Sequence, residues 1–216
     1  MLAENKQRML ITGASRGVGK ACADYFRDKY QVITVARTGD VTYRGDLTNL
    51  EFLKKLCREV DADILINNAA VYGKDFQTTI DLNLRATGYL LSEFYKKMTT
   101  GHIINICSSS ANSTGWVGMP PERIWYNALK SALKTLSKHF ADAKLKNVKV
   151  TSIEPARINT AIGESLIAVS EEEYSKQTLP WIPMKPSYIA EVIDWILSQP
   201  AHVVISSIEI QNFKKG

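Results

Sequence analysis

The stretch Thr12-Gly13-Ala14-Ser15-Arg16-Gly17-Val18-Gly19 decides the fold of this chain. It follows the apolar run Met9–Thr12 and opens the helix-like segment Gly17–Lys29. In that setting Gly13 permits a tight turn, Gly17 lets the backbone approach a pyrophosphate, and Gly19 lets the helix pack closely on the strand. The helix N-terminus adds free N–H groups and the positive end of a dipole. An ordinary strand-to-helix turn is the alternative, but the context favours a dinucleotide site.

Apolar runs alternate with helix-like stretches along the rest of the chain. The strand-like runs are Met9–Thr12, Val32–Ala36, Ile64–Ile66, Ile103–Cys107, Val148–Ile153 and Val203–Ile210. The helix-like stretches are Gly17–Lys29, Leu50–Val60, Ile80–Lys97, Arg123–Lys144 and Tyr188–Ser198. The first four runs are apolar nearly throughout, which is typical of strands buried on both faces. The alternation predicts an α/β fold, a Rossmann-type doubly wound parallel sheet, in a single domain spanning residues 1–216.

One connection in this pattern is too short for an ordinary crossover. Only Arg37–Asp40 separates the run Val32–Ala36 from the strand-like piece Val41–Arg44. A crossover between parallel strands takes a dozen residues or more. We therefore expect either a loop or a shortened, vestigial third strand at this edge of the sheet.

Composition and charge exclude several classes of protein. The chain is 45% hydrophobic and 23% charged, as in folded globular domains and unlike disordered chains or disulfide scaffolds. Its three cysteines and three histidines are scattered, so we expect no disulfide framework and no metal site. The sequence shows no signal peptide and no apolar run long enough to span a membrane, so we expect a cytoplasmic protein that does not bind membranes. The net charge of +5 alone would suit nucleic acid, but the basic residues form no stripe, and we expect no nucleic-acid partner.

The residues after the second strand-like run indicate which dinucleotide binds. The run ends in Val35-Ala36-Arg37-Thr38, without the acidic residue that would bind the ribose hydroxyls of NAD. Arg37 and Arg16 are suited instead to hold a 2′-phosphate through paired hydrogen bonds. A solvated surface charge is the alternative for each arginine, but together they predict NADP(H) as the cofactor.

A tyrosine and a lysine stand one helical turn apart in the stretch Arg123–Lys144. Tyr126 and Lys130 are four residues apart, so they share one face of the predicted helix. An ammonium beside a phenol stabilises the phenolate, and such a pair can give a proton to the oxygen of a carbonyl that is being reduced. The spacing alone is common by chance, and a surface pair is the alternative.

Taken together, the motifs are similar to those of one family over nearly the whole chain. In the family's order they are Thr12–Gly19, Asp46-Leu47, Asn67-Asn68-Ala69-Ala70, Asp81-Leu82-Asn83-Leu84, Asn105-Ile106-Cys107-Ser108, Tyr126 with Lys130, and the segment from Pro155 to Thr160. The sequence thereby resembles the short-chain dehydrogenase/reductase family. The resemblance implies an NADP(H)-dependent oxidoreductase that reduces a ketone or aldehyde, or oxidises the corresponding alcohol, with a small-molecule substrate. It also implies a homodimer or homotetramer. The alternative is an NADP-binding sensor without turnover, which would not need the catalytic set.

The resemblance also implies the residues of the site. Tyr126 would be the acid/base, Lys130 would assist it and hold the nicotinamide ribose, Ser108 would bind the substrate oxygen, and Asn83 would hold a proton-relay water. The residues that would bind the cofactor are Gly13, Ser15, Arg16, Gly17, Val18, Gly19, Arg37, Asp46, Leu47, Asn67, Ala69, Tyr126, Lys130, Pro155, Ile158 and Thr160.

Several positions depart from the family's pattern. The interval from Ser108 to Tyr126 is long, with Gly115–Ile124 as an extra loop, and the serine role could shift to Ser109. The family's Pro-Gly becomes Pro155-Ala156, and the following Arg157 is either a surface charge or a contact for a phosphate or substrate acid. The chain is also shorter than is usual for the family. The missing length lies after Arg37 and between Tyr72 and Asn83.

The substrate-covering segment is expected at about residues 161–186. Ser170 with Glu173 matches a capping box, so we expect a short helix near Glu171–Lys176. Apolar side chains would line a pocket, or equally belong to the core or a subunit interface; they are Trp116, Met119, Trp125, Trp181, Ile182 and Met184. We expect an uncharged or weakly polar carbonyl substrate.

Overall fold

A parallel sheet forms the centre of the computed structural model, which describes residues 6–113, 117, 119–160, 162 and 182–213. Within these residues the sheet has seven strands in the order β3-β2-β1-β4-β5-β6-β7. The strands are β1 (Arg8–Thr12), β2 (Gln31–Ala36), β3 (Tyr43–Arg44), β4 (Ile64–Asn67), β5 (Thr100–Ile106), β6 (Asn147–Pro155) and β7 (Ser207–Ile210). The chain moves outward from β1 to β2 and β3, then returns to β4 on the other side of β1. In such sheets ligands bind outside the carboxyl ends of the strands at this reversal.

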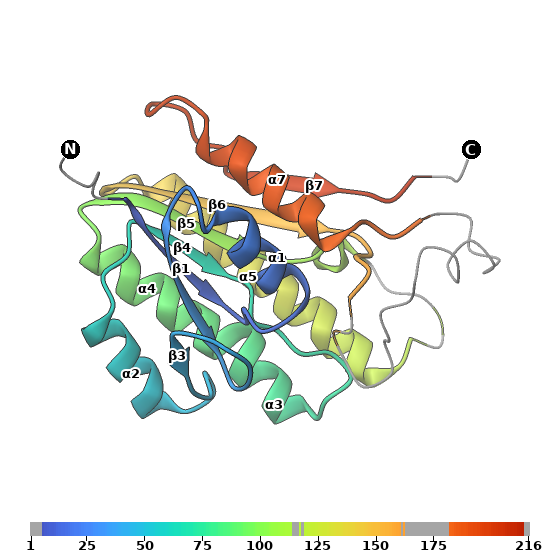
Figure 1. Ribbon diagram of the computed structural model, residues 1–216. Helices are drawn as coiled ribbons and strands as arrows, with labels where there is room; N and C mark the ends of the chain where they lie inside the picture. The colour runs from blue at the N-terminus through green and yellow to red at the C-terminus, as the bar shows by residue number, and fades with distance from the viewer. Residues whose placement is uncertain (1–5, 114–116, 118, 161, 163–181, 214–216) are drawn as a thin grey trace.

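Helices cover both faces of the sheet (Figure 1). Helices α1 (Gly17–Phe26) and α7 (Pro186–Leu197) lie on one face, and α2 (Leu50–Glu59), α4 (Thr87–Lys97) and α5 (Pro121–Ala143) lie on the other. Strand β1 shows why its run is continuously apolar. Leu10 packs in the layer with α2, α4 and α5, whereas Met9 and Ile11 pack in the layer with α1 and α7, and all three are fully buried. The predicted doubly wound α/β fold is confirmed.

Strand β3 is the vestigial edge strand expected from the short connection. Its two residues pair in parallel with Val35 and Ala36 of β2. The turn is closed by side chains: Thr34 Oγ1 accepts from Thr42 N at 2.9 Å, and Thr42 Oγ1 accepts from Thr34 N at 3.1 Å. Gly39 turns the chain with φ +91°, a value that glycine adopts readily. No helix separates β2 from β3.

The predicted helix Ile80–Lys97 is longer and less regular in the structure. It starts as α3 (Phe76–Ile80), where Asp75 Oδ1 accepts from Thr78 N at 2.9 Å and caps the first turn. A π-helical segment, η1 (Asp81–Ala86), then leads into α4. The apolar period of an α-helix does not reveal such a segment, although π-helical turns are frequent at functional sites.

Two other boundaries differ from the prediction. Helix α5 begins at Pro121, because a proline fits the first helical turn, so the expected extra loop Gly115–Ile124 ends before this proline. The strand expected at Val203–Ile210 is confined to β7. The expected helix near Glu171–Lys176, and with it Trp116, Trp181 and most of the segment 161–186, lies outside the described residues.

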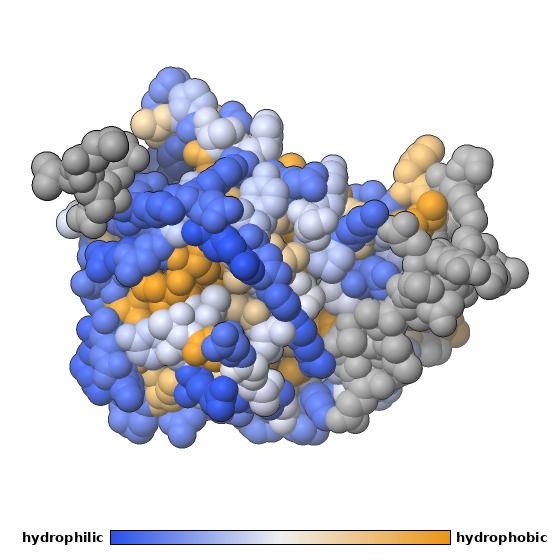
Figure 2. Space-filling model, in the orientation of Figure 1, coloured by the Kyte–Doolittle hydropathy of each residue, from blue (hydrophilic) through white to orange (hydrophobic). Residues whose placement is uncertain are grey.

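Polar side chains cover most of the face seen in Figure 2, and the apolar residues that show there form small, separate patches. The largest fully buried apolar side chains, such as Phe26 and Phe94, lie in the two core layers. In the described part of the chain, no helix is both long enough and apolar enough to cross a membrane.

Candidate functional site

The glycine-rich stretch forms a cradle that has no room for larger side chains. Gly13 has φ +68°, and a Cβ there would lie 2.9 Å from Ala69 Cα. A Cβ on Gly19 would lie 2.4 Å from the Gly13 carbonyl oxygen and 2.6 Å from Asn68 Nδ2. Thr12 Oγ1 in turn accepts from the backbone N–H groups of Asn68 and Ala69 at 3.0 and 3.1 Å. The loops after β1 and β4 are thus bound together at the reversal of the sheet.

The N-terminus of α1 opens onto this cradle. Its N-cap residue is Arg16, which makes no side-chain capping hydrogen bond. The first N–H groups of a helix have no partner inside the helix, so they are available to an anion here. Thr160 lies beside them, because a Cβ on Gly17 would come within 3.2 Å of Thr160 Cγ2. The structure therefore brings the two distant motifs together.

Arg37 and Asp46 mark the outer end of the cradle. Their side chains are 64% and 43% exposed and form a long ion pair, with Arg37 Nη1 at 3.9 Å from Asp46 Oδ2. The other oxygen, Asp46 Oδ1, accepts from the backbone N and the hydroxyl of Thr48, both at 2.8 Å. An exposed pair at this distance adds little stability, so Arg37 can turn to another anion.

Two of the expected cofactor residues pack in the core instead of facing the loop. Val18 belongs to the layer of α1 and α7, and Leu47 belongs to the layer of α2, α4 and α5. Their exposures are only 8% and 6%. A cofactor contact through either side chain stays a prediction.

Asn67 ties the sheet to α5. Its Nδ2 donates to Asn105 Oδ1 at 2.9 Å, and Asn105 Nδ2 donates to Ser137 Oγ at 2.8 Å. Ser137 Oγ donates in turn to the carbonyl of Leu133 at 2.7 Å. This buried polar chain fixes the carboxyl ends of β4 and β5 against the helix that carries Tyr126.

Asn83 sits in the π-helical segment and holds the loop after β4. The residue is 1% exposed, its Nδ2 donates to the carbonyl of Val71 at 2.8 Å, and its Oδ1 accepts from Val71 N at 2.9 Å. The side chain thus fixes the backbone directly before Tyr72. Its expected role in holding a relay water stays a prediction.

Tyr126 and Lys130 face the same region from α5. Lys130 is 3% exposed, its Nζ donates to the Ile106 carbonyl at 2.8 Å, and it lies 5.8 Å from the centroid of the Tyr126 ring. The Tyr126 ring packs edge-on against Tyr72 at 5.3 Å between centroids. Both residues are buried, so the ammonium and the phenol ring share one region from which solvent is excluded. The helical spacing therefore places the pair together.

Ser108 follows β5 and caps a short 3-10 helix, η2 (Ser109–Asn112). Its Oγ accepts from Ser110 N at 3.1 Å, which leaves the hydroxyl hydrogen available for another acceptor. Ile106, whose carbonyl receives Lys130, lies two residues before it. Ser109 is instead the first residue of η2. The choice between Ser108 and Ser109 as the serine of the site stays a prediction.

The segment after β6 is fastened by a residue that the sequence does not single out. Asn212 Oδ1 accepts from Arg157 N at 2.8 Å, and its Nδ2 donates to the carbonyls of Arg157 and Ile182 at 3.1 and 2.9 Å. Ile158 forms a single parallel bridge with Met184. The chain on both sides of residues 161–181 is therefore held next to the end of β6, which terminates at Pro155.

Of the apolar residues expected to line a substrate pocket, those that the structure describes include two with partly exposed side chains. Trp125 is 43% exposed and packs on Phe76, with ring centroids 4.8 Å apart. Ile182 is 53% exposed. Met119 lies against Asn127, whose Nδ2 donates to its sulfur at 3.9 Å. Whether these residues line a substrate pocket stays a prediction.

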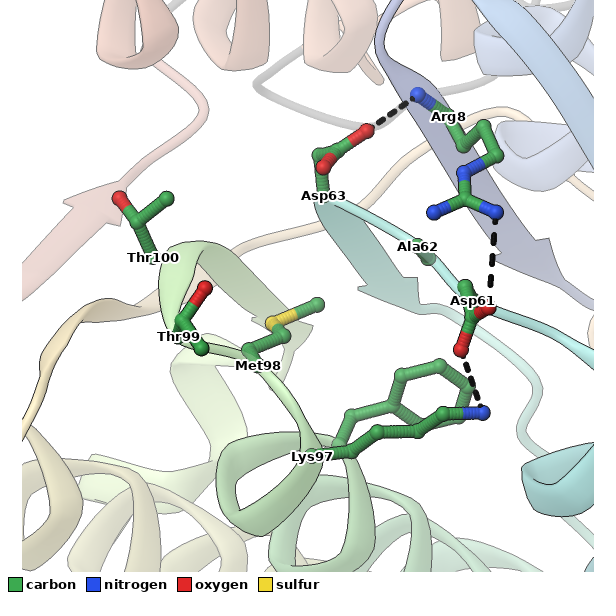
Figure 3. Close-up of a pocket in the computed structure, with 9 residues that line it drawn as sticks. Arg8, Asp61, Ala62, Asp63, Lys97, Met98, Thr99 and Thr100 are labelled. Carbon is green, nitrogen blue, oxygen red and sulfur yellow. Dashed lines mark hydrogen bonds and ion pairs between the residues drawn. The ribbon is translucent and has the colours of Figure 1, made fainter.

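A separate cavity of about 220 Å³ lies at the opposite, amino-terminal ends of β1, β4 and β5 (Figure 3). Arg8 and Lys97 both pair with Asp61 there, at 3.6 and 2.7 Å. Asp63 accepts from the backbone N of Arg8 at 2.7 Å. Its charged groups are thus engaged with one another, at the end of the sheet opposite the glycine cradle.

Comparison with known proteins agrees with this geometry. A family model described as short chain dehydrogenase matches residues 7–170. Serine 3-dehydrogenase from Rhizobium radiobacter is 30% identical, over 94% of this chain and 92% of the relative. Glucose 1-dehydrogenase 2 from Bacillus subtilis is 25% identical, over 90% of this chain and 89% of the relative.

Solved structures match over most of their length as well. A 4-hydroxyisoleucine dehydrogenase complexed with NADH and succinate is 29% identical, with a TM-score of 0.74 and coverage of 94% of this chain and 97% of the other. A serine dehydrogenase complexed with NADP+ is 24% identical, with a TM-score of 0.77 and coverage of 94% of each chain. At 24% identity, the likeness to the serine dehydrogenase structure concerns the fold alone.

Proposed function

Since this chain belongs to the short-chain dehydrogenase family of oxidoreductases, we propose that it interconverts a small carbonyl compound and the corresponding alcohol with NADP(H). The observation that carries the proposal is the buried Lys130, held by the Ile106 carbonyl beside the ring of Tyr126. A buried ammonium is costly, and a site that only binds a nucleotide has no need of it next to a phenol.

The cradle fits a dinucleotide. Its glycines let the backbones of the loops after β1 and β4 approach closely, and the uncapped N-terminus of α1 supplies N–H groups for a pyrophosphate. Thr160 and Ile158 would hold the carboxamide end of the nicotinamide. Arg37 and Arg16 would hold a 2′-phosphate, and no acidic residue at the end of β2 competes for the ribose hydroxyls. These features support NADP(H), while the similar structures carry NADP+ in one case and NADH in the other.

When bound, the nicotinamide would supply or accept the hydride. In the direction of reduction, Tyr126 would donate its hydroxyl proton to the substrate oxygen as negative charge develops there. Lys130 would stabilise the phenolate that remains. The Ser108 hydroxyl would donate a second hydrogen bond to the same oxygen, as an oxyanion hole does. Asn83 would keep the loop before Tyr72 in place through its two bonds to Val71.

The relatives suggest where to look for the substrate. Their names mention serine, 4-hydroxyisoleucine and glucose, each a small molecule that carries a hydroxyl group. We therefore extend the uncharged or weakly polar carbonyl compounds expected from the sequence to hydroxy acids and sugars. We also propose a homodimer or homotetramer located in the cytoplasm.

Titration of the purified protein with NADPH and NADH, read by nicotinamide fluorescence, tests the function. Carbonyl compounds, and with NADP+ the corresponding alcohols, are then added to the same samples. The proposal predicts tighter binding of NADPH and oxidation of NADPH by at least one carbonyl class. Tight binding with no turnover over the whole panel would favour a sensor, and no binding of either dinucleotide would contradict the proposal.

A further inference from the structure

The turn that follows the proposed catalytic serine is held by polar contacts, not by the core. Helix η2 starts directly after Ser108, and none of its residues is buried. Ser108 Oγ is bonded to the backbone of Ser110 within this turn, at 3.1 Å. The direction of the Ser108 hydroxyl therefore depends on where η2 lies.

Side chains from α5 and β7 clamp η2 from two sides. Ser131 Oγ donates to the Ala111 carbonyl at 2.6 Å, and Lys134 Nζ donates to Asn112 Oδ1 at 2.8 Å. On the other side, Asn112 Nδ2 donates to Glu209 Oε2 at 2.7 Å. The turn is thus fixed between a helix and the edge strand of the sheet.

A buried carboxylate explains the position of Lys134. Glu154 in β6 is fully buried, accepts from the Ser152 hydroxyl, and accepts from Ser207 Oγ at 2.8 Å. Lys134 Nζ lies 3.7 Å from Glu154 Oε2. A buried carboxylate is costly unless it is hydrogen-bonded and paired, so Glu154 draws the ammonium inward, where it also reaches Asn112.

Lys134 also lies on the face of α5 that carries the reactive pair. Tyr126, Lys130 and Lys134 follow one another at intervals of four residues, which places them along one face. Lys130 binds the carbonyl of Ile106, before Ser108, and Lys134 binds the side chain of Asn112, after it. The two lysines therefore hold the chain on both sides of the serine.

We propose that Lys134 and Glu154 are positioning residues for Ser108. The carboxylate fixes the ammonium, the ammonium fixes Asn112, and η2 then presents the Ser108 hydroxyl to the substrate oxygen. The inference rests on the proposed function, because it requires Ser108 to contact the substrate. The opposing hypothesis is that the ion pair only stabilises the fold, so that turnover changes only when stability does.

A pair of variants separates these hypotheses. Lys134→Met leaves a buried carboxylate without its cation and should lower both Tm and kcat/KM. Lys134→Met with Glu154→Gln removes both charges, so Tm should recover. If the pair positions Ser108, kcat/KM stays about tenfold below that of the unaltered protein, because Asn112 still lacks its lysine. If kcat/KM recovers together with Tm, the proposal is overturned.

Lys138→Met is the matched control. Lys138 lies one turn further along α5 in an exposed ion pair, so this variant should change neither Tm nor kcat/KM.

A double-mutant cycle with Ser108→Ala tests whether Lys134 acts through the serine. The kcat loss caused by Lys134→Met should largely disappear in the Ser108→Ala background, while the Kd for NADPH stays the same in all four proteins. Equal losses in both backgrounds would overturn the positioning role and leave the proposed function intact. If Ser108→Ala turns over as fast as the unaltered protein, the inference fails while the proposed oxidoreductase function stands. If the unaltered protein has no turnover, the proposed function fails and the inference fails with it.

Discussion

Lys130 is bound through Nζ to the backbone carbonyl of Ile106 at 2.8 Å, so the end of β5 fixes an ammonium inside the protein. Its position on α5 places this charge 5.8 Å from the ring of Tyr126. The proposed electrostatic help for the tyrosine would therefore come from an ammonium that the backbone of β5 holds in place, as in preorganised sites.

Arg37→Asp should move cofactor preference from NADPH toward NADH. The change removes the guanidinium proposed to hold the 2′-phosphate and places a carboxylate where the ribose hydroxyls would be bound. The ratio of the Kd values for NADPH and NADH, measured by fluorescence, should rise by about tenfold or more. Arg58→Asp, an equal change of charge at an exposed position on α2, is the control. The same ratio in both variants would show that Arg37 does not read the phosphate.

Gly19→Ala should damage the cradle. The new Cβ would lie 2.4 Å from the Gly13 carbonyl oxygen, so the loop or the helix must shift. We expect about 1–3 kcal/mol loss in the free energy of unfolding, together with weaker NADPH binding. Gly88→Ala places its Cβ 3.3 Å from Leu136 Cδ2, within a helix, and serves as the control. Denaturant unfolding and the NADPH titration give both quantities. Unchanged NADPH affinity in Gly19→Ala would contradict the proposed role of the cradle.

The buried His102 should make stability depend on acid pH. Burial lowers its pKa from 6.5 to about 4, and its Nε2 is hydrogen-bonded to Thr151 Oγ1 at 2.7 Å. Between these values the unfolded chain binds a proton that the folded chain does not, so stability falls as the pH falls from 6.5 to about 4. The loss attributable to this residue is at most about 3 kcal/mol.

Denaturant unfolding of the His102→Gln variant over this pH range isolates the contribution of that imidazole. The fall in its free energy of unfolding with decreasing pH should be shallower than that of the unaltered protein. His139→Gln, at an exposed histidine on α5, should keep the original slope. A His102→Gln slope equal to that of the unaltered protein would mean that the acid sensitivity has another source.

The sheet and the main elements of the site were predictable because they depend on local patterns. Apolar runs buried on both faces give the strands, and the glycines of Gly13–Gly19 give the cradle. A four-residue interval on a helix placed Lys130 beside Tyr126. The short interval after Arg37 correctly predicted a vestigial third strand.

Other features depend on contacts that are distant in the sequence. The π-helical segment around Asn83 has no signature in the apolar period. Glu154 interrupts an apolar run, and only the fold shows that Ser207 and Lys134 converge on it. Likewise, only the fold brings Asn212 next to Arg157. Polar groups of this kind are satisfied by partners that the chain alone does not reveal.

Oxidation of bound NADPH by a carbonyl substrate, followed in parallel for the unaltered protein and Tyr126→Phe, shows whether Tyr126 is the proton donor of the reaction. The exchange removes one hydroxyl and keeps the ring packed on Tyr72. We expect an unchanged Kd for NADPH and a rate lower by about 10²–10⁴-fold, because the acid that protonates the substrate oxygen is gone. A Tyr126→Phe rate close to that of the unaltered protein would contradict the account.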